Sequence, residues 1–287
     1  MDTPKSLSAV VDPVISLVSS AKLRDTLRRV FSEGQAAVGD IEEVFRVLPS
    51  SAWSRDLLCT FASSWKATHL KMLAIYGLSC RLQRAAEHVE ELDRSSLHLA
   101  AAKNASTSYE DLGLDFDGHT HAELYEDFAE ALTGGDLWEL RRYRLPEAHR
   151  FGQWVYRNMV VEAISDGLLT NVFSEIYNHG EYSIALPAAG AYLQRHTRLT
   201  AAERSKAVTY IAVHVEDEVE AAHFLAVVEA LDRYLAASGT RLDPARAESI
   251  FHTYLRNLAQ VMRRLTEMMR GELASRAGDS QPAGGAA

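Results

Sequence analysis

Residues 201–237, AAERSKAVTYIAVHVEDEVEAAHFLAVVEALDRYLAA, decide how the fold of this chain is interpreted. The stretch has no glycine and no proline, and it is rich in residues that favour helices, with apolar side chains recurring every three or four positions. Thr200 and Glu203 form a capping-box pattern at its start, and Gly239 follows its end. The sequence therefore predicts one long helix over residues 200–237.

The same helical periodicity continues through most of the 287 residues, whereas runs that alternate Val, Ile or Thr with polar residues are few. We predict helices near residues 14–33, 36–47, 54–80, 82–103, 119–133, 147–177, 183–196, 200–237 and 243–272. The chain is thus predicted to be all-α, with a single helical domain over residues 1–272. The small and polar residues of 273–287 predict a disordered C-terminal tail.

Composition and charge narrow the class of protein. The chain has 30 Lys and Arg residues against 39 Asp and Glu residues, a formal charge of −9, and 47% of its residues are hydrophobic. This balance favours a folded protein and disfavours a surface for nucleic acids or anionic membranes. Because the only cysteines are Cys59 and Cys80, a disulfide framework or a thiolate metal cluster is excluded.

Targeting and assembly signals are sparse. No apolar run approaches the ~20 residues that cross a bilayer, and residues 1–20 lack the basic start and apolar core of a signal peptide. We therefore expect a cytoplasmic protein without a membrane or nucleic-acid partner. A homodimer is expected if the apolar residues of the first helix are exposed; these are Val14, Ile15, Leu17 and Val18.

The middle of the long predicted helix carries two polar residues within its apolar stripe. Glu218 lies about 40° from His214 on a helical projection, and apolar side chains surround both. Burial of these groups is costly unless they are paired, so either a metal ion or hydrogen bonds from another helix must compensate them. Glu216, Glu220 and His223 are predicted to point into solvent, although Glu220 and His223 have the Glu-x-x-His spacing of helical di-iron sites.

A second pattern of acids and a histidine precedes the predicted helix at 119–133. Glu110 and Asp111 stand before a loop that contains glycine, and His121 follows Asp111 by ten positions. His121 lies at the buried edge of the helix, so the loop could bring Asp111 and His121 to one centre. The alternative interpretation is a helix cap without metal.

Together these patterns resemble the haem-oxygenase-like di-iron oxidases over roughly residues 55–235. The resemblance implies a haem-oxygenase-like helical bundle whose metal ligands are Asp111, His121, Glu181, His214 and Glu218. Glu181 is assigned by its distance before His214 and by the leucines that follow it. The family's pattern His-x-x-x-acid-x-x-His departs here, because its last position is Ala221. His223 would need a π-bulge to turn inward and replace that ligand.

The resemblance implies a non-haem di-iron oxidase or oxygenase that binds Fe(II), two ions per chain, with O₂ as co-substrate. Imidazole and carboxylate ligands suit ferrous iron and leave positions open for oxygen and substrate. The implied substrate is a small amino-acid-like molecule, an amine or a carboxylate, that is N-oxygenated or oxidatively cleaved in bacterial specialised metabolism. An external electron donor could take part.

Three alternatives stay open. The same fold could work without iron, as a cofactor-independent oxidase or as a thiaminase-II-like enzyme with a nucleophilic cysteine. A haem-degrading oxygenase would need an axial histidine near the start of the chain, and residues 1–68 contain none. The chain could also be a non-catalytic helical interaction protein, which the alanine at position 221 favours.

Other polar residues have less decided roles. His69 shares a helix face with Trp65 and is expected to be a hydrogen-bonded core histidine. Three arginines could hold a substrate carboxylate, although a solvent-facing role is favoured; they are Arg141, Arg142 and Arg144. Three acids could replace the missing ligand, although a structural role is favoured; they are Glu162, Asp166 and Glu175.

Overall fold

The computed structural model describes residues 6–69, 71–89, 91–108, 119–215 and 219–279. Every regular element within these ranges is a helix, which confirms the all-α prediction. The α-helices are α1 (Leu7–Ile15), α2 (Ala21–Glu33), α3 (Gln35–Val47), α4 (Arg55–His69), α5 (Met72–Ala86), α6 (Glu91–Ser106), α7 (His121–Thr133), α8 (Pro146–Val160), α9 (Ile164–His196), α10 (Ala201–Ala207), α11 (Thr209–Ala212), α12 (Val219–Ala237) and α13 (Pro244–Asp279). Short 3₁₀ helices are η1 (Leu48–Ser50), η3 (Asp136–Glu139) and η4 (Arg141–Tyr143).

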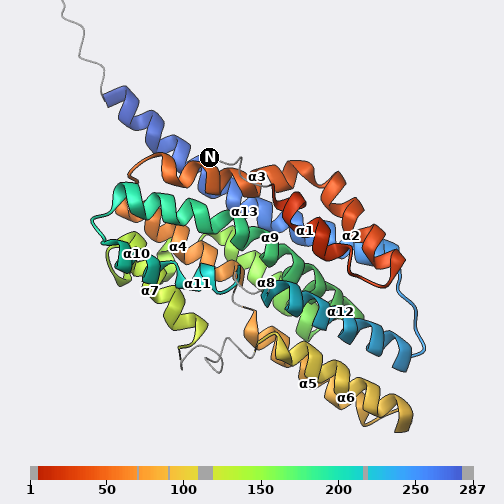
Figure 1. Ribbon diagram of the computed structural model, residues 1–287. Coiled ribbons are helices and arrows are strands. Elements are labelled where there is room, and N and C mark those ends of the chain that lie inside the picture. Colours follow the sequence, from red (N-terminus) through yellow and green to blue (C-terminus); the bar gives the residue numbers. More distant parts are fainter. Residues whose placement is uncertain (1–5, 70, 90, 109–118, 216–218, 280–287) are drawn as a thin grey trace, which may run out of the picture.

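The helices form two groups around α9. The long blue α13 runs beside α2 and α3, and α9 packs against α1, α8, α12 and α13 (Figure 1). At one end of the molecule α7 packs against α4, α10 and α11, and at the other end α5 and α6 pack together beside α12. Because α9 contacts α10 and α11 at the first of these ends and α5 and α12 at the second, it connects the two ends of the molecule.

Large aromatic side chains fill the interior where α4, α7 and α9 meet. Trp65 of α4 is fully buried, and its ring makes edge contacts with Phe128 of α7 and with Tyr182 of α9. Burial of one such side chain contributes roughly 1.5–3 kcal/mol. Apolar packing therefore fixes α4, α7 and α9 relative to one another.

Several helix ends lie where capping residues predict them. Thr120 and Glu123 form a capping box at the start of α7, and Gly134 ends this helix with a φ of 73°. Thr200 and Glu203 form the same motif at the start of α10. These caps satisfy backbone donors that a helix leaves unpaired at its first turn.

The prediction of one helix over residues 54–80 is wrong. The helix α4 ends at His69, and α5 begins at Met72 after Lys71, whose backbone N–H donates to the carbonyl oxygen of His69 at 2.8 Å. Residues three and four apart share a helix face, whereas residues two apart do not. The break therefore frees His69 and Lys71 to face the same side.

The helix predicted over residues 200–237 is also interrupted. It is divided into α10, α11 and α12, with a turn at residues 213–215, and residues 216–218 lie outside the described part of the chain. By contrast, α9 is continuous where the sequence predicted two helices, even though it contains Pro187. Ala185 and Ala188 on either side of this proline are buried, so packing outweighs the lost backbone hydrogen bond.

Both ends of the chain differ from the prediction. Val14, Ile15 and Val18 are buried within the chain and only Leu17 is exposed, so the apolar face on which the homodimer expectation rested is covered. At the other end α13 continues to Asp279, into the predicted tail, and residues 280–287 lie outside the described residues. Among the described helices, none combines the length and the apolar character that crossing a membrane requires.

Candidate functional site

A small polar cavity lies where the ends of several helices meet the middle of α9. It has a volume of about 30 Å³, which is room for one or two water-sized species. Its titratable lining residues come from α4, the α4–α5 junction, α7, α9 and the segment from α11 to α12; they are His69, Lys71, His121, Glu175, His214, Glu220 and His223. Such a gathering of imidazoles and carboxylates in the interior is typical of a functional site.

His214 lies in this cavity just after α11. Its ring stacks on that of Tyr182 with centroids 4.1 Å apart, and its centroid lies 4.6 Å from that of His121. Burial is the main reason that the pKa of His214 lies well below its ordinary value, and electrostatic interactions with His121 and His69 act in the same direction. The imidazole is therefore neutral near pH 7, which is the form that binds metal ions.

The contact between His214 and Glu220 is short without being a hydrogen bond. Nδ1 of His214 lies 2.8 Å from Oε1 of Glu220, and both side chains are almost completely buried. Neither ring nitrogen of His214 makes a hydrogen bond within the part of the chain that the structure describes. Adjacent ligands of one metal ion lie roughly 3 Å apart when the bonds are about 2.1 Å long, so this pair has a separation that suits metal binding.

Three further ligand atoms lie close together beside this pair. One atom each from Glu175 of α9, and from Glu220 and His223 of α12, lies within 4.8 Å of the others. Both carboxylates are buried and His223 is partly buried. Because ferrous iron takes imidazole and carboxylate ligands, the residues present fit such an ion.

Lys71 places a positive charge against one of these carboxylates. Its Nζ donates to Oε1 of Glu175 at 2.9 Å and to Oγ of Ser174 at 2.6 Å. Only 12% of the lysine side chain is exposed. The ammonium group therefore compensates a buried carboxylate that would be costly if it were unpaired.

Glu181 is fully buried and is held from α4. Its Oε1 accepts a hydrogen bond from Nε1 of Trp65 at 3.2 Å, and its Oε2 lies 2.8 Å from Nε2 of His69. Nδ1 of His69 lies 2.9 Å from the carbonyl oxygen of Trp65. The expectation of a hydrogen-bonded core histidine at position 69 is confirmed, but its second role, in lining the polar cavity, was missed.

The structure brings some of the residues expected from the sequence together and leaves others untested. His121 and His214 line the polar cavity, and Glu181 lies behind His69. Asp111 and Glu218 lie outside the described residues.

The prediction that Glu220 and His223 face solvent is wrong. It assumed one unbroken helix from 200 to 237, on which His214 and Glu220 lie about 240° apart. The interruption before α12 removes that constraint, so both residues line the cavity. The π-bulge proposed for this segment stays untested, because residues 216–218 lie outside the described residues. Glu175, expected to be structural, joins them as a potential ligand.

Solved structures of other proteins share this helical architecture. No protein-family model matches the sequence, and no curated protein matches it significantly. A TenA homolog from Pseudomonas syringae pv. tomato is similar with a TM-score of 0.59 and 11% identity, over 84% of this chain and 93% of that one. A CADD-like protein of unknown function from Nostoc punctiforme is similar with a TM-score of 0.53 and 10% identity, over 92% and 96%. The chain has the haem-oxygenase-like fold. At these identities the likeness concerns the fold alone.

The haem-oxygenase-like bundle holds a second and much larger cavity, with a volume of about 920 Å³. His69, His121 and Tyr210 line both cavities, so the two adjoin. The lining of the large cavity is mostly apolar, and α4, α5, α7 and α8 supply most of it. A cavity of this size can hold a small-molecule ligand.

Neither cysteine belongs to these cavities. Cys59 is buried in α4, and burial is the main reason that the pKa of its thiol is raised. Cys80 is exposed on α5. Neither residue is among those that line the two cavities.

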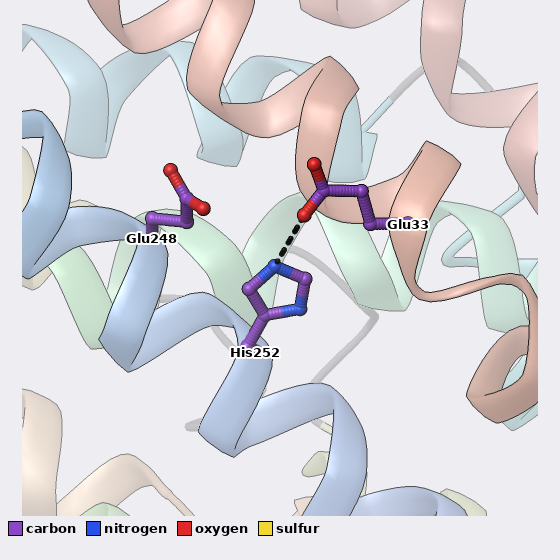
Figure 2. Close-up of side chains that lie close together, drawn as sticks. All are labelled: Glu33, Glu248 and His252. Carbon is purple, nitrogen blue, oxygen red and sulfur yellow. Dashed lines mark ion pairs between the residues drawn. The ribbon is translucent and has the colours of Figure 1, made fainter.

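Another group of potential ligands lies between α2 and α13. Figure 2 shows Glu33 and His252 facing each other across an ion pair of 3.4 Å, with Glu248 one turn before His252. Glu33 is exposed, and Glu248 also pairs with Arg29 at 3.2 Å. These contacts make the group a network of surface ion pairs.

Proposed function

We propose that this protein is a non-haem iron oxidase or oxygenase that uses O₂ to oxidise a small substrate. The observation that carries the proposal is the set of donors from Glu175, Glu220 and His223, with the neutral His214 beside them. The fold supports it, because the di-iron oxidases that the sequence resembles share this architecture. Glu175, Glu220 and His214 are buried and His223 is partly buried, so a metal ion would offset the cost of burying charge.

In this proposal Glu175, Glu220, His214 and His223 bind ferrous iron. His121 lines the same cavity and is proposed, with Asp111, Glu181 and Glu218, to complete the two-iron centre that the resemblance implies. When bound, ferrous iron supplies the activation of O₂.

The chain's own residues prepare the site in other ways. Burial keeps His214 unprotonated, so that a nitrogen lone pair is available to an ion. The hydroxyl groups of Tyr182 and Tyr210 form a hydrogen bond of 2.8 Å in the cavity wall, and both rings contact His214. This packing orients the imidazole and leaves little room for bulk water.

One observation favours an alternative without iron. The Nζ of Lys71 lies 2.9 Å from Glu175, so a cation of the chain already compensates that carboxylate. A cofactor-independent oxidase is therefore the second candidate. A thiaminase-II-like enzyme is less well supported, because it needs a nucleophilic cysteine and neither Cys59 nor Cys80 lines a cavity.

Metal analysis after anaerobic loading with ferrous iron tests the proposal. We expect the wild-type protein to retain about two ions per chain after desalting, and Glu220→Gln to lose iron. Glu229→Gln is the matched control on the same helix, because Glu229 forms surface ion pairs with Lys103 and Arg233. Circular dichroism verifies that each variant is folded.

Two outcomes would contradict the proposal: a folded wild-type protein that retains no iron, or equal iron content in both variants. If the wild-type protein oxidises a substrate with O₂ while it is free of metal, the cofactor-independent alternative holds instead.

A further inference from the structure

The large cavity that adjoins the histidines has a wall of mixed chemistry. Most of its lining is apolar, and two cationic side chains, Lys66 and Arg144, are part of it. The cavity therefore joins a surface that suits a hydrocarbon to positive charges that suit an anion.

Arg144 is the more informative of the two cations. It follows η4 and is half-buried, and its Nε is fully buried without a hydrogen-bond partner within the described ranges. No ion pair between described residues involves Arg144 either. A buried guanidinium nitrogen normally donates to an acceptor such as a carboxylate. Here the chain supplies no such partner among its described residues.

Lys66 of α4 adds to the positive potential. Its Nζ lies 4.6 Å from the ring centroid of Trp138 and 4.0 Å from Oε1 of Glu126. Burial lowers the pKa of Lys66, and the charge of Arg144 lowers it further, whereas Glu126 and Glu139 act in the opposite direction. The two cations are thus close enough to repel each other, and an anion between them would relieve that repulsion.

The apolar part of the cavity reaches the surface. Leu73 of α5 is 73% exposed and Tyr156 of α8 is 51% exposed, and both line the cavity. Large apolar side chains exposed at the edge of a cavity are typical of a binding site for apolar ligands. Val155 and Ala148 continue this surface into the interior, where both are buried.

We propose that the large cavity binds a monocarboxylate with an apolar tail, whose carboxylate pairs with the guanidinium of Arg144. Lys66 contributes charge, and the tail lies against Leu73, Val155 and Tyr156. The inference rests on the proposed function only in treating this ligand as the substrate of the iron centre. An amino-acid-like substrate is disfavoured, because its ammonium group would meet two cations.

Calorimetric titration of the metal-free full-length protein tests the inference independently of iron. Decanoate, below its micelle-forming concentration, is expected to bind at least about tenfold more tightly than decanol, because only decanoate makes a charge-assisted pair with Arg144. Decylamine and glutamate are expected not to bind, since the first brings a positive charge and the second lacks an apolar tail.

Variants locate the two halves of the site. Arg144→Gln is expected to reduce the affinity for decanoate to that for decanol, whereas Arg141→Gln, an exposed arginine of the same segment, should leave both unchanged. Gly152→Leu is expected to reduce the binding affinity for both ligands alike. Gly152 lines the cavity, and an added Cβ would meet only ordinary contact there, so we expect a leucine at this position to fill space in the cavity.

The inference is overturned if wild-type protein binds decanoate no better than decanol, or if Arg144→Gln keeps the preference. Absence of binding by both ligands would overturn it as well. Because Arg144 is no metal ligand in the proposed function, the Arg144→Gln protein should retain the wild-type content of iron. The two proposals can therefore be distinguished. Loss of decanoate binding in a protein with normal iron content concerns the inference about the large cavity alone. Normal decanoate binding in a protein that retains no iron concerns the proposed function alone.

Discussion

Nδ1 of His214 lies 2.8 Å from Oε1 of Glu220, although the two residues are six positions apart on a segment that the sequence predicts to be one helix. The turn at residues 213–215 interrupts the predicted helix between the two residues and makes this approach geometrically feasible. It brings an imidazole that burial keeps neutral against a buried carboxylate. The chemistry of the cavity thus depends on an interrupted helix.

Stability should depend on pH through His214. In the unfolded chain its pKa is about 6.5, and in the folded protein it is well below that value. Between these two values the unfolded state binds a proton that the native state does not, so stability decreases as the pH falls below 6.5. Each unit by which the pH falls in this range should lower the free energy of unfolding by up to about 1.4 kcal/mol.

Urea unfolding of the metal-free protein at pH 5.5 and 7.5 measures this dependence. His214→Gln should lose less stability than the wild type when the pH is lowered from 7.5 to 5.5. His88→Gln replaces an exposed histidine and should behave like the wild type. The explanation fails if His214→Gln loses as much stability as the wild type.

Replacement of Lys71 should have opposite effects on stability and on iron binding. Lys71→Met leaves the carboxylate of Glu175 buried without its cation, which should destabilise the metal-free protein by about 3–5 kcal/mol. The same change should raise the affinity for ferrous iron, because an ion then replaces the lost charge. Thermal unfolding and a competition titration with a chelator measure the two effects.

Lys103→Met is the control for that experiment. Lys103 pairs with Glu229 at 2.8 Å, but both side chains are more than a third exposed. Lys103→Met should therefore lower the free energy of unfolding by at most about 1 kcal/mol. Unchanged iron affinity in Lys71→Met would show that the lysine does not compete with a metal ion.

Two buried tryptophans donate hydrogen bonds to different kinds of acceptor, one to a charged carboxylate and the other to a neutral carbonyl oxygen. Nε1 of Trp65 donates to the carboxylate of Glu181 at 3.2 Å, and Nε1 of Trp53 donates to the carbonyl oxygen of Leu48 at 2.7 Å. Trp65→Phe should lose about 1.5–3 kcal/mol from its hydrogen bond and Trp53→Phe about 0.5–1.5 kcal/mol, beside a similar packing loss. Chemical denaturation measures both, and a larger loss in Trp53→Phe would contradict this account of Glu181.

Two glycines of α9 should respond oppositely to alanine. A Cβ on Gly180 would lie 2.8 Å from Cγ of Leu7 and 2.9 Å from Cγ1 of Val11, so Gly180→Ala should push α1 away and destabilise by about 1–3 kcal/mol. A Cβ on Gly190 meets nothing within 4 Å, so Gly190→Ala should stabilise by about 0.5–1 kcal/mol. Melting temperatures of the pair check both, and a stable Gly180→Ala would contradict close packing of α1 on α9.

Local patterns predicted the fold class well, because helical period and capping chemistry are encoded within a few residues. Thr200 with Glu203 begins a helix as predicted, and Gly134 ends one. Tertiary packing decided what the local pattern could not. The sequence predicts a break between two helices at residues 178–182, yet Asn178, Glu181 and Tyr182 are buried and α9 is continuous there.

The candidate site was predicted in part. His121 and His214 were expected from polar residues in apolar stripes, and both line the cavity. Glu175 was named only as one of three acids that could replace the missing ligand, and Lys71 was not named, since nothing in the local pattern indicates a contact between α9 and the α4–α5 junction. Glu220 and His223 have the Glu-x-x-His spacing, and His223 was also considered as a replacement for the ligand missing at Ala221. The assumption of an unbroken helix outweighed both signals.

The polar cavity is lined largely from the terminal turns of helices. His69 is the last residue of α4, His121 is the first of α7, and Glu220 is the second of α12. Terminal turns fray at a small fraction of the free energy that unfolds a whole protein. A ligand that enters this cavity can thus reshape three of its walls by local fraying, while the middle of α9 stays in place as the fixed reference against which they move.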